Sequence, residues 1–360
     1  MPAPAPAPAR SAVFHELTVA AVDRLCEDAV AITFAVPGEL REAFAFRAGQ
    51  SLTLRRVIGG REHRRTYSIC APAGAAPRIG IREIPDGLFS SWLVHEVTPG
   101  TRIEVRPPSG SWQADPAAGE RHLCIAAGSG ITPMLSVAST VLTHPAAQVS
   151  LVYGNRTSRT VMFAEELGDL KNRYGPRLQL VHVLSREPRD AELFSGRLDR
   201  DRLHRLLTGP VPAEVFDRVW LCGPFPMVED ARAVLDGLGV PRDRVHVELF
   251  YVDAPPPEPR RAAGTPSGAT TELTTVLDGL RTTSTVSRET TILEGAQATR
   301  ADLPFACKGG VCGTCRAAVR AGEADMRRNH ALEPSEVDAG FVLTCQTFPV
   351  GAALTVDYDA

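Results

Sequence analysis

The sequence predicts a multidomain chain with three architectures: an antiparallel β-barrel, an α/β domain with a parallel sheet, and a small α+β domain of the β-grasp type. Three observations predict this. Short strand-like runs broken by Gly and Pro fill residues 11–116, as in an antiparallel barrel. Buried-strand runs alternate with helical segments over 117–250. An Asp-Gly turn between two alternating strands opens the region 271–360.

Composition excludes several classes of protein. The 360 residues are 44% hydrophobic and 22% charged, which is typical of a globular protein with two or three domains. The net charge of −3 and the absence of a long basic run do not indicate a nucleic-acid partner. No apolar stretch approaches the ~20 residues that span a bilayer, so no membrane partner is expected. The opening MPAPAPAPAR does not resemble a secretory signal. We therefore expect a disordered tail over 1–10 and a cytoplasmic protein.

The middle region contains HLCIAAGSGITPMLSVASTVL (122–142), a buried strand followed by a glycine turn and an amphipathic helix. A dinucleotide phosphate loop requires this context, because glycines let the backbone approach the phosphates. Gly128 and Gly130 fit that purpose, and Thr132 and Pro133 open the helix. The spacing is not the Rossmann Gly-x-Gly-x-x-Gly. Three further strands, in VSLVYGNRT, LQLVHVLSRE and RVWLCGPFPM, predict a parallel sheet with crossover helices.

The last third of the chain begins with a change of composition. Residues 251–270 are rich in Pro, Gly, Ser and Thr and predict a flexible linker. The run ELTTVLDGLRTTSTV (272–286) alternates apolar and polar residues on both sides of Asp278-Gly279, which predicts a β-hairpin. ETTILEGAQ is expected to be helical, and ALTVDY to form a closing strand. Together with a cysteine loop, this order resembles the ferredoxin fold.

Four of the eight cysteines follow the plant-type [2Fe–2S] spacing. Three of them lie in the segment CKGGVCGTC and the fourth follows after 29 intervening residues, so the predicted ligands are Cys307, Cys312, Cys315 and Cys345. Two bridged irons need two thiolates each, and the loop glycines Gly309, Gly310 and Gly313 let backbone N–H groups point at sulfur. A structural zinc site or a redox Cys-x-x-Cys pair is the alternative, although zinc sites more often show two paired hooks.

The stretches RTYS (65–68) and GIREIPDGLFSSWL (80–93) resemble the flavin reductases of the ferredoxin–NADP reductase superfamily. The resemblance implies that Tyr67 faces the isoalloxazine ring and that Ser68 hydrogen-bonds its polar edge. It also implies phosphate contacts from the following residues: Arg65, Arg82, Gly87 and Ser90. Phe250 would cover the second face of the flavin. The structural alternatives are an outward tyrosine, a solvated Arg82 and a core Phe250. The Gly-x-x-Ser pattern favours FAD over FMN.

The same superfamily carries a Gly-x-Gly-x-x-Pro nucleotide loop, which residues 128–133 match. By resemblance, Ser185-Arg186 and Arg156 bind the 2′-phosphate of NADPH. NADH would be indicated by an acidic residue on the ribose, and none is evident in that stretch. The turn Cys222-Gly223-Pro224 resembles the one that lies beside the nicotinamide. Solvated or structurally paired arginines and a simply buried Cys222 are the alternatives.

The order of flavin barrel, nucleotide domain and ferredoxin domain resembles the reductase components of multicomponent oxygenases over 11–250 and 271–360. Phrases such as YGNRT, HVLSRE, CKGGVCGTCRA and GFVLTCQ are most similar to the reductase subunits of phenylacetyl-CoA epoxidases. The resemblance implies an electron path from NADPH through the flavin and the [2Fe–2S] cluster to a di-iron oxygenase, with no catalytic residue beyond cofactor positioning. The alternatives are a reductase for a ring or steroid hydroxylase, or a redox-sensing cluster protein.

Overall fold

The computed structural model describes residues 13–110, 112, 114–250, 268–332 and 334–360. The predicted tail over 1–10 and most of the predicted linker over 251–270 lie outside the described residues. The chain divides into two compact units, one spanning Glu16–Val252 and the other comprising Met1–His15 with Asp253–Ala360.

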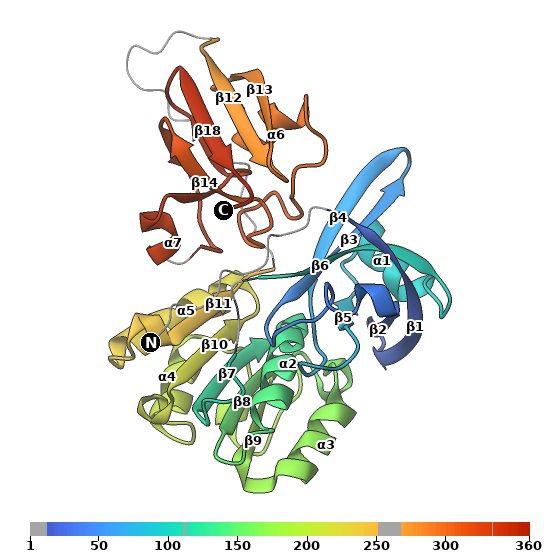
Figure 1. The fold of residues 1–360 in the computed structure, drawn as a ribbon. Coiled ribbons are helices and arrows are strands. Elements are labelled where there is room, and N and C mark those ends of the chain that lie inside the picture. Colours follow the sequence, from blue (N-terminus) through green and yellow to red (C-terminus); the bar gives the residue numbers. More distant parts are fainter. Residues whose placement is uncertain (1–12, 111, 113, 251–267, 333) are drawn as a thin grey trace. The chain divides into compact units, whose positions relative to one another are not determined.

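The first unit begins with a six-stranded antiparallel sheet whose strand order is β4-β3-β6-β1-β2-β5 (Figure 1). Its strands are β1 (His15–Cys26), β2 (Ala29–Ala35), β3 (Ser51–Ile58), β4 (Arg61–Ser68), β5 (Arg78–Arg82) and β6 (Arg102–Ser109). The chain just beyond β4 returns to β5, because Ile69 bridges Ile79 and the amide of Cys70 donates to the carbonyl of Arg78 at 2.8 Å. This pairing joins the two outer strands, so the predicted β-barrel is confirmed. Helix α1 (Leu88–His95) follows β5.

Strand β2 shows how one strand supports two cores. Its Val30, Ile32 and Phe34 are buried in the barrel core, whereas Ala29 and Ala31 are buried in the core of the following domain. Successive side chains of a strand point to opposite faces, so the small alanines let the neighbouring domain pack closely. The barrel is thereby covered on one face by the nucleotide domain.

That domain contains a five-stranded parallel sheet of order β11-β10-β7-β8-β9. Its strands are β7 (Arg121–Ala127), β8 (Gln148–Asn155), β9 (Leu178–Leu184), β10 (Arg218–Cys222) and β11 (Val245–Glu248). The helices are α2 (Ile131–Val141), α3 (Ala164–Tyr174), α4 (Arg200–Thr208) and α5 (Phe225–Gly237). The strand order reverses between β7 and β10, which makes their carboxyl ends the expected ligand crevice.

Close contacts join the barrel to α2. A Cβ at Gly80 on β5 would lie 2.6 Å from Cγ2 of Thr132 and 2.7 Å from Cζ of Phe163. The Ser136 hydroxyl donates to the carbonyl of Ala71 at 2.7 Å. The packing leaves no room for a side chain at position 80, and it places the nucleotide loop beside β5.

The second unit contains a five-stranded mixed sheet of order β13-β12-β18-β14-β16 and a two-stranded sheet of β15 and β17. Its elements are β12 (Thr270–Leu277), β13 (Leu280–Ser287), α6 (Ile292–Gln297), β14 (Arg316–Ala321), β15 (Ala324–Met326), α7 (Pro334–Asp338), β16 (Phe341–Leu343), β17 (Thr347–Pro349) and β18 (Ala353–Asp357). Asp278 and Gly279 both have positive φ, at 53° and 71°, as a two-residue type I′ hairpin requires. The parallel pairing of β12 with β18 confirms the predicted β-grasp architecture.

Single 3₁₀ turns complete the described secondary structure: Gly38–Leu40, Gly128–Gly130, Ser158–Thr160, Gly175–Arg177, Glu192–Phe194, Ala213–Val215 and Arg242–Arg244. Among the residues described, no helix is long and apolar enough to cross a membrane.

Candidate functional site

The predicted nucleotide loop lies at the crevice between β7 and β10. Gly128 has a φ of +58°, a left-handed conformation that glycine adopts without strain. A Cβ at Gly130 would lie 2.1 Å from the carbonyl oxygen of Cys222. The loop and the turn after β10 therefore touch, and only glycine at position 130 permits this contact. Two predicted parts of the nucleotide site, 128–130 and 222–224, are brought together here.

A cluster of three polar residues lies at the same crevice. The Ser68 hydroxyl at the end of β4 is within 3.0 and 3.1 Å of the two carboxyl oxygens of Glu248. Glu248 ends β11 and is the register partner of Cys222 on β10. Glu248 therefore adjoins both Ser68, a predicted flavin residue, and Cys222, the predicted neighbour of the nicotinamide.

Burial dominates the electrostatics of this cluster. Desolvation raises the pKa of Glu248 to about 7, and the hydrogen bond from Ser68 lowers it only in part. Desolvation also raises the pKa of the fully buried Cys222 thiol, with a further contribution from the charge of Glu248. Near neutral pH, Glu248 can hold or release a proton, whereas Cys222 stays a thiol. These properties suit Glu248 to proton exchange and exclude Cys222 as a thiolate nucleophile in the folded protein.

Sequence reasoning missed Glu248. A signal was available, because the run VHVELF places a carboxylate at the carboxyl end of a parallel strand, the edge where ligands bind in open α/β sheets.

The other predicted flavin residues lie on β4 and beyond β11. The Tyr67 ring is 6.5 Å from that of Phe89, centroid to centroid, and desolvation raises the Tyr67 pKa. Arg65 is exposed and donates to the carbonyl of Arg64 at 2.7 Å. Phe250 is 37% exposed, so it is not a core residue. Arg65 and Phe250 are exposed and Tyr67 is half-buried, so all three side chains have surface that a bound group can contact.

Helix α1 offers the predicted phosphate position. Its N-cap Gly87 provides no side-chain cap, so backbone N–H groups at the helix start are available to an anion. The Ser90 hydroxyl accepts from the amide of Ile84 at 3.1 Å and donates to the carbonyl of Gly87 at 3.2 Å. Ser90 thus holds the turn that presents the helix start. The residues described fit FAD, because an anion position, an open tyrosine face and a polar partner occur on one barrel.

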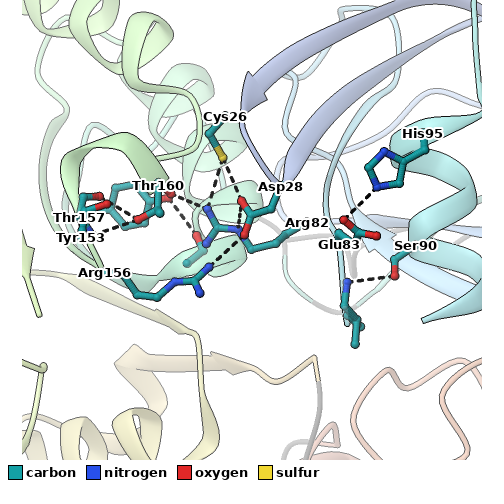
Figure 2. A network of polar contacts seen from close by, with 12 residues as sticks. Cys26, Asp28, Arg82, Glu83, Ser90, His95, Tyr153, Arg156, Thr157 and Thr160 are labelled. Carbon is teal, nitrogen blue, oxygen red and sulfur yellow. Dashed lines mark hydrogen bonds and ion pairs between the residues drawn. The ribbon is translucent and has the colours of Figure 1, made fainter. Parts of the chain in front are cut away.

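Arg82 points to the other side of β5. Figure 2 shows its guanidinium directed toward Asp28 and Thr160, whereas Ser90 lies with Glu83 and His95. Its Nε is 3.2 Å from Asp28 Oδ1, and its Nη2 donates to the carbonyl of Thr160. A Cβ at Gly128 would lie 3.2 Å from Arg82 Nη1. Arg82 is thus structurally paired beside the nucleotide loop, and the contacts described do not join it to the phosphate position at α1.

Arg156 belongs to the same network, because its Nη2 donates to Asp28 Oδ2 at 3.0 Å (Figure 2). Its side chain nevertheless remains 49% exposed. The amides of Ser185 and Arg186 donate to the carbonyls of Asn155 and Arg156 at 2.9 and 2.7 Å. The three residues predicted to bind the 2′-phosphate are therefore brought together at the ends of β8 and β9.

Sequence reasoning missed two carboxylates in this area. Asp28, in the β1–β2 turn, pairs with both arginines, and Glu187 accepts from the amide and hydroxyl of Ser158 at 2.7 and 2.9 Å. An aspartate in a hairpin turn gives no sequence signal for such a role, since Asp is common in turns.

Three further parts of the predicted nucleotide site have structural roles: Thr132, Pro133 and the turn 223–224. Thr132 is 1% exposed and donates to the carbonyl of Ser129 at 3.0 Å, and Pro133 is also buried. A Cβ at Gly223 would lie 2.7 Å from Cε of Met227. Pro224 is the N-cap of α5. These residues shape the loop and the helix starts.

The four predicted cluster ligands of the second unit form two pairs. The Cys312 thiol lowers the pKa of Cys307 and the Cys345 thiol raises the pKa of Cys315, so each of these pairs lies close together; Cys307 and Cys312 are half-buried, and Cys315 and Cys345 are buried. Within the described parts of the chain, no group of three or more His, Cys, Asp or Glu side chains is placed to hold one metal ion. Two thiol pairs fit a two-iron cluster, which needs two thiolates for each iron, better than a single zinc ion.

Backbone donors surround the first ligand. The amide of Gly309 donates to Cys307 Sγ at 3.3 Å, and the backbone of Val311 and Cys312 also acts to lower the pKa of this thiol. The pKa of Cys307 is lowered to about 6, first by the Cys312 thiol. Such donors stabilise a thiolate, the form that binds iron. The donor set therefore fits a [2Fe–2S] cluster.

Comparison with known proteins agrees with this geometry. Family models match the oxidoreductase FAD-binding domain over residues 16–114, the oxidoreductase NAD-binding domain over 124–233 and the 2Fe-2S iron-sulfur cluster binding domain over 275–350. The chain belongs to the ferredoxin reductase family, as an oxidoreductase of the kind that forms the reductase components of multicomponent oxygenases. Its cofactors are FAD and a [2Fe–2S] cluster, and it uses a nicotinamide nucleotide.

Two relatives resemble this chain over nearly its whole length. The chain is 42% identical to one of the subunits of 1,2-phenylacetyl-CoA epoxidase from Escherichia coli, over 96% of this chain and 98% of the relative. It is 34% identical to the ferredoxin reductase component of 3-ketosteroid-9-alpha-monooxygenase from Rhodococcus rhodochrous, over 95% and 96%.

Among solved structures, phthalate dioxygenase reductase matches with a TM-score of 0.58 and 23% identity over 96% of this chain and 98% of that one. A type IV self-sufficient cytochrome P450 monooxygenase matches with a TM-score of 0.70 and 20% identity over 95% of this chain, which spans 41% of that protein. At these identities the two structures support the fold.

Proposed function

We propose that this protein is the NADPH-dependent reductase of an oxygenase that epoxidises phenylacetyl-CoA. The observation that carries the proposal is the 42% identity to the Escherichia coli epoxidase component over nearly the full length of both chains. Bound FAD would accept a hydride from the nucleotide and release electrons singly to the cluster, which would pass them to the partner. The partner would be a di-iron oxygenase, and substrate chemistry would take place there.

The chain's own residues would orient the reactants. Tyr67, Arg65 and the start of α1 would hold FAD, with Phe250 beside it. The loop at Gly128 and Gly130 would bind the nucleotide phosphates through backbone N–H groups. The Ser68–Glu248 pair would control the proton near the site of transfer, because the pKa of Glu248 is about 7.

The preference for NADPH is supported by the convergence of Arg156, Ser185 and Arg186 at the ends of β8 and β9. Arg186→Ala should lower the ratio of kcat/KM for NADPH over NADH at least about tenfold, since a charge-assisted contact with phosphate contributes about 1.5–3 kcal/mol. Arg189→Ala, which removes an exposed arginine three residues further along the chain, is the matched control. An unchanged ratio in Arg186→Ala would remove the support for NADPH.

Partner identity is tested with purified proteins. The reductase is mixed with phenylacetyl-CoA oxygenase subunits, and NADPH oxidation is followed with and without phenylacetyl-CoA. Oxidation that rises with substrate and yields a matching amount of oxygenated product would support the assignment. If NADPH bleaches the flavin and the cluster but no product forms, the partner is another oxygenase. The 34% identity to the 3-ketosteroid-9-alpha-monooxygenase reductase makes a steroid hydroxylase the second candidate.

The four cysteines outside the cluster, Cys26, Cys70, Cys124 and Cys222, form no disulfide, which supports a reducing compartment such as the cytoplasm as the place of action.

A further inference from the structure

The residue after the fourth cluster ligand is a buried glutamine whose side chain contacts the ligand loop. Gln346 is 1% exposed. Its Nε2 donates to the carbonyl of Lys308 at 2.8 Å and to the carbonyl of Cys345 at 3.0 Å, and it lies 3.8 Å from Cys345 Sγ, within hydrogen-bonding distance for sulfur. One amide group therefore links the fourth ligand to the loop that carries the first, 38 residues away in sequence.

Backbone hydrogen bonds of Gln346 and its contact with Gly310 fix the direction of this side chain. The amide of Gln346 donates to the carbonyl of Leu343 at 2.8 Å, and its own carbonyl accepts from the amide of Arg327 at 2.9 Å. A Cβ at Gly310 would lie 2.9 Å from Gln346 Cγ, and Gly310 has a φ of +79°. The turn at Gly310 is therefore packed directly on the glutamine, which leaves the amide little freedom to move away.

We propose that Gln346 is a positioning residue that raises the reduction potential of the cluster. Reduction adds a negative charge, which the Gln346 amide group 3.8 Å from Cys345 Sγ stabilises more strongly than it stabilises the oxidised form. The contact with the carbonyl of Lys308 keeps that amide group in place. The inference rests on the cluster assigned above to the four cysteines, and it makes the glutamine part of what lets electrons pass from FAD to the cluster.

Gln346→Met tests the proposal, because methionine fills a similar volume without an N–H donor. The midpoint potential of the bound cluster is measured by redox titration followed by electron paramagnetic resonance. We expect the equilibrium constant for one-electron reduction to fall about tenfold, which corresponds to a potential lower by about 59 mV. Thr271→Val is the matched control, since it removes a 1% exposed hydroxyl that donates to the carbonyl of Gly351, outside the ligand loop. Its potential should not change.

A structural role alone predicts a different result. In that case Gln346→Met, like Thr271→Val, would lower the midpoint temperature of unfolding of the second unit and leave the reduction potential of the cluster unchanged. That result would overturn the proposal. If Gln346→Met does not retain the cluster, Gln346→Glu keeps the shape and replaces the donor by a carboxylic acid. Its potential should lie below that of the parent protein, because a carboxylate provides no N–H donor to the sulfur. A potential equal to that of the parent protein would also overturn it. Loss of the cluster signal from the parent protein itself would instead refute the proposed function.

Discussion

Glu248 is the residue whose chemistry depends most on its surroundings. Its ordinary pKa of 4.5 is raised to about 7 because its carboxyl group is enclosed by protein, and its described hydrogen-bond donor, Ser68, compensates only in part. The folded protein therefore binds a proton at pH 5–6 that the unfolded chain has released. By linkage, the contribution of Glu248 to the free energy of unfolding is greatest at low pH and declines as the pH rises from about 4.5 to about 7.

This shift gives a prediction for stability. The decline should amount to about 3 kcal/mol, because each pKa unit corresponds to about 1.36 kcal/mol. Glu248→Gln should remove it, so that the urea midpoint of the variant, followed by flavin fluorescence, changes less between about pH 5 and pH 8 than that of the parent protein. Glu214→Gln, which alters an exposed glutamate of the same domain, serves as the control. An equal pH dependence in both variants would assign the effect to other groups.

At the scale of elements, the β1–β2 turn connects the barrel with the nucleotide domain. Asp28 pairs with Arg82 of β5 and with Arg156 beyond β8. If Arg156 binds a 2′-phosphate, the carboxylate of Asp28 opposes that binding, since it neutralises the arginine and repels the phosphate. NADH carries no such phosphate and is not affected in the same way.

Asp28→Asn should therefore raise the ratio of kcat/KM for NADPH over NADH severalfold in steady-state assays. Asp23→Asn is a closely matched control, because Asp23 lies on β1 and likewise pairs with an arginine of β5, Arg78, at 2.9 Å, with no described contact with Arg156. If Asp28→Asn lowers the ratio instead, Asp28 orients Arg156 for the phosphate and does not compete with it.

The β12–β13 hairpin is held by the end of the chain. The amides of Asp278 and Gly279 donate to the two carboxylate oxygens of Asp359 at 2.7 and 2.8 Å. Asp359→Ala should lower the stability of the second unit by about 1–2 kcal/mol, since two charge-assisted hydrogen bonds are lost in a solvated position. Loss of cluster absorbance on heating measures this effect. Glu323→Ala, at an exposed position of the same unit, is expected to unfold like the parent protein.

At the scale of the whole molecule, the FAD-binding and NAD-binding domains belong to one compact unit and the 2Fe-2S domain belongs to the other. Cys312→Ser should abolish electron delivery to an oxygenase or to an artificial one-electron acceptor that the cluster serves, while NADPH still bleaches the flavin at the parental rate in stopped-flow experiments. Thr271→Val, which removes a buried hydroxyl of the same unit outside the ligand loop, should retain both activities. Loss of flavin reduction in Cys312→Ser would contradict this division of labour.

Much of the fold was predictable because each part has a local signal. Alternation around Asp278-Gly279 predicted the hairpin, and the glycine turn after a buried strand predicted the start of the nucleotide domain. The spacing of the four cysteines likewise predicted the ligand set of a [2Fe–2S] cluster. Such signals depend on backbone geometry and side-chain period, which a short segment sets by itself.

Only the tertiary structure decided which segments far apart in sequence contact one another. Ser68 and Glu248 meet across 180 positions, Asp28 and Arg156 across 128, and Gln346 and Lys308 across 38. The sequence named Arg82 as a possible phosphate contact, but its partners depend on how the barrel packs on the nucleotide domain. Burial, and with it the raised pKa of Glu248, follows from that packing, because the neighbours that exclude water come from other parts of the chain.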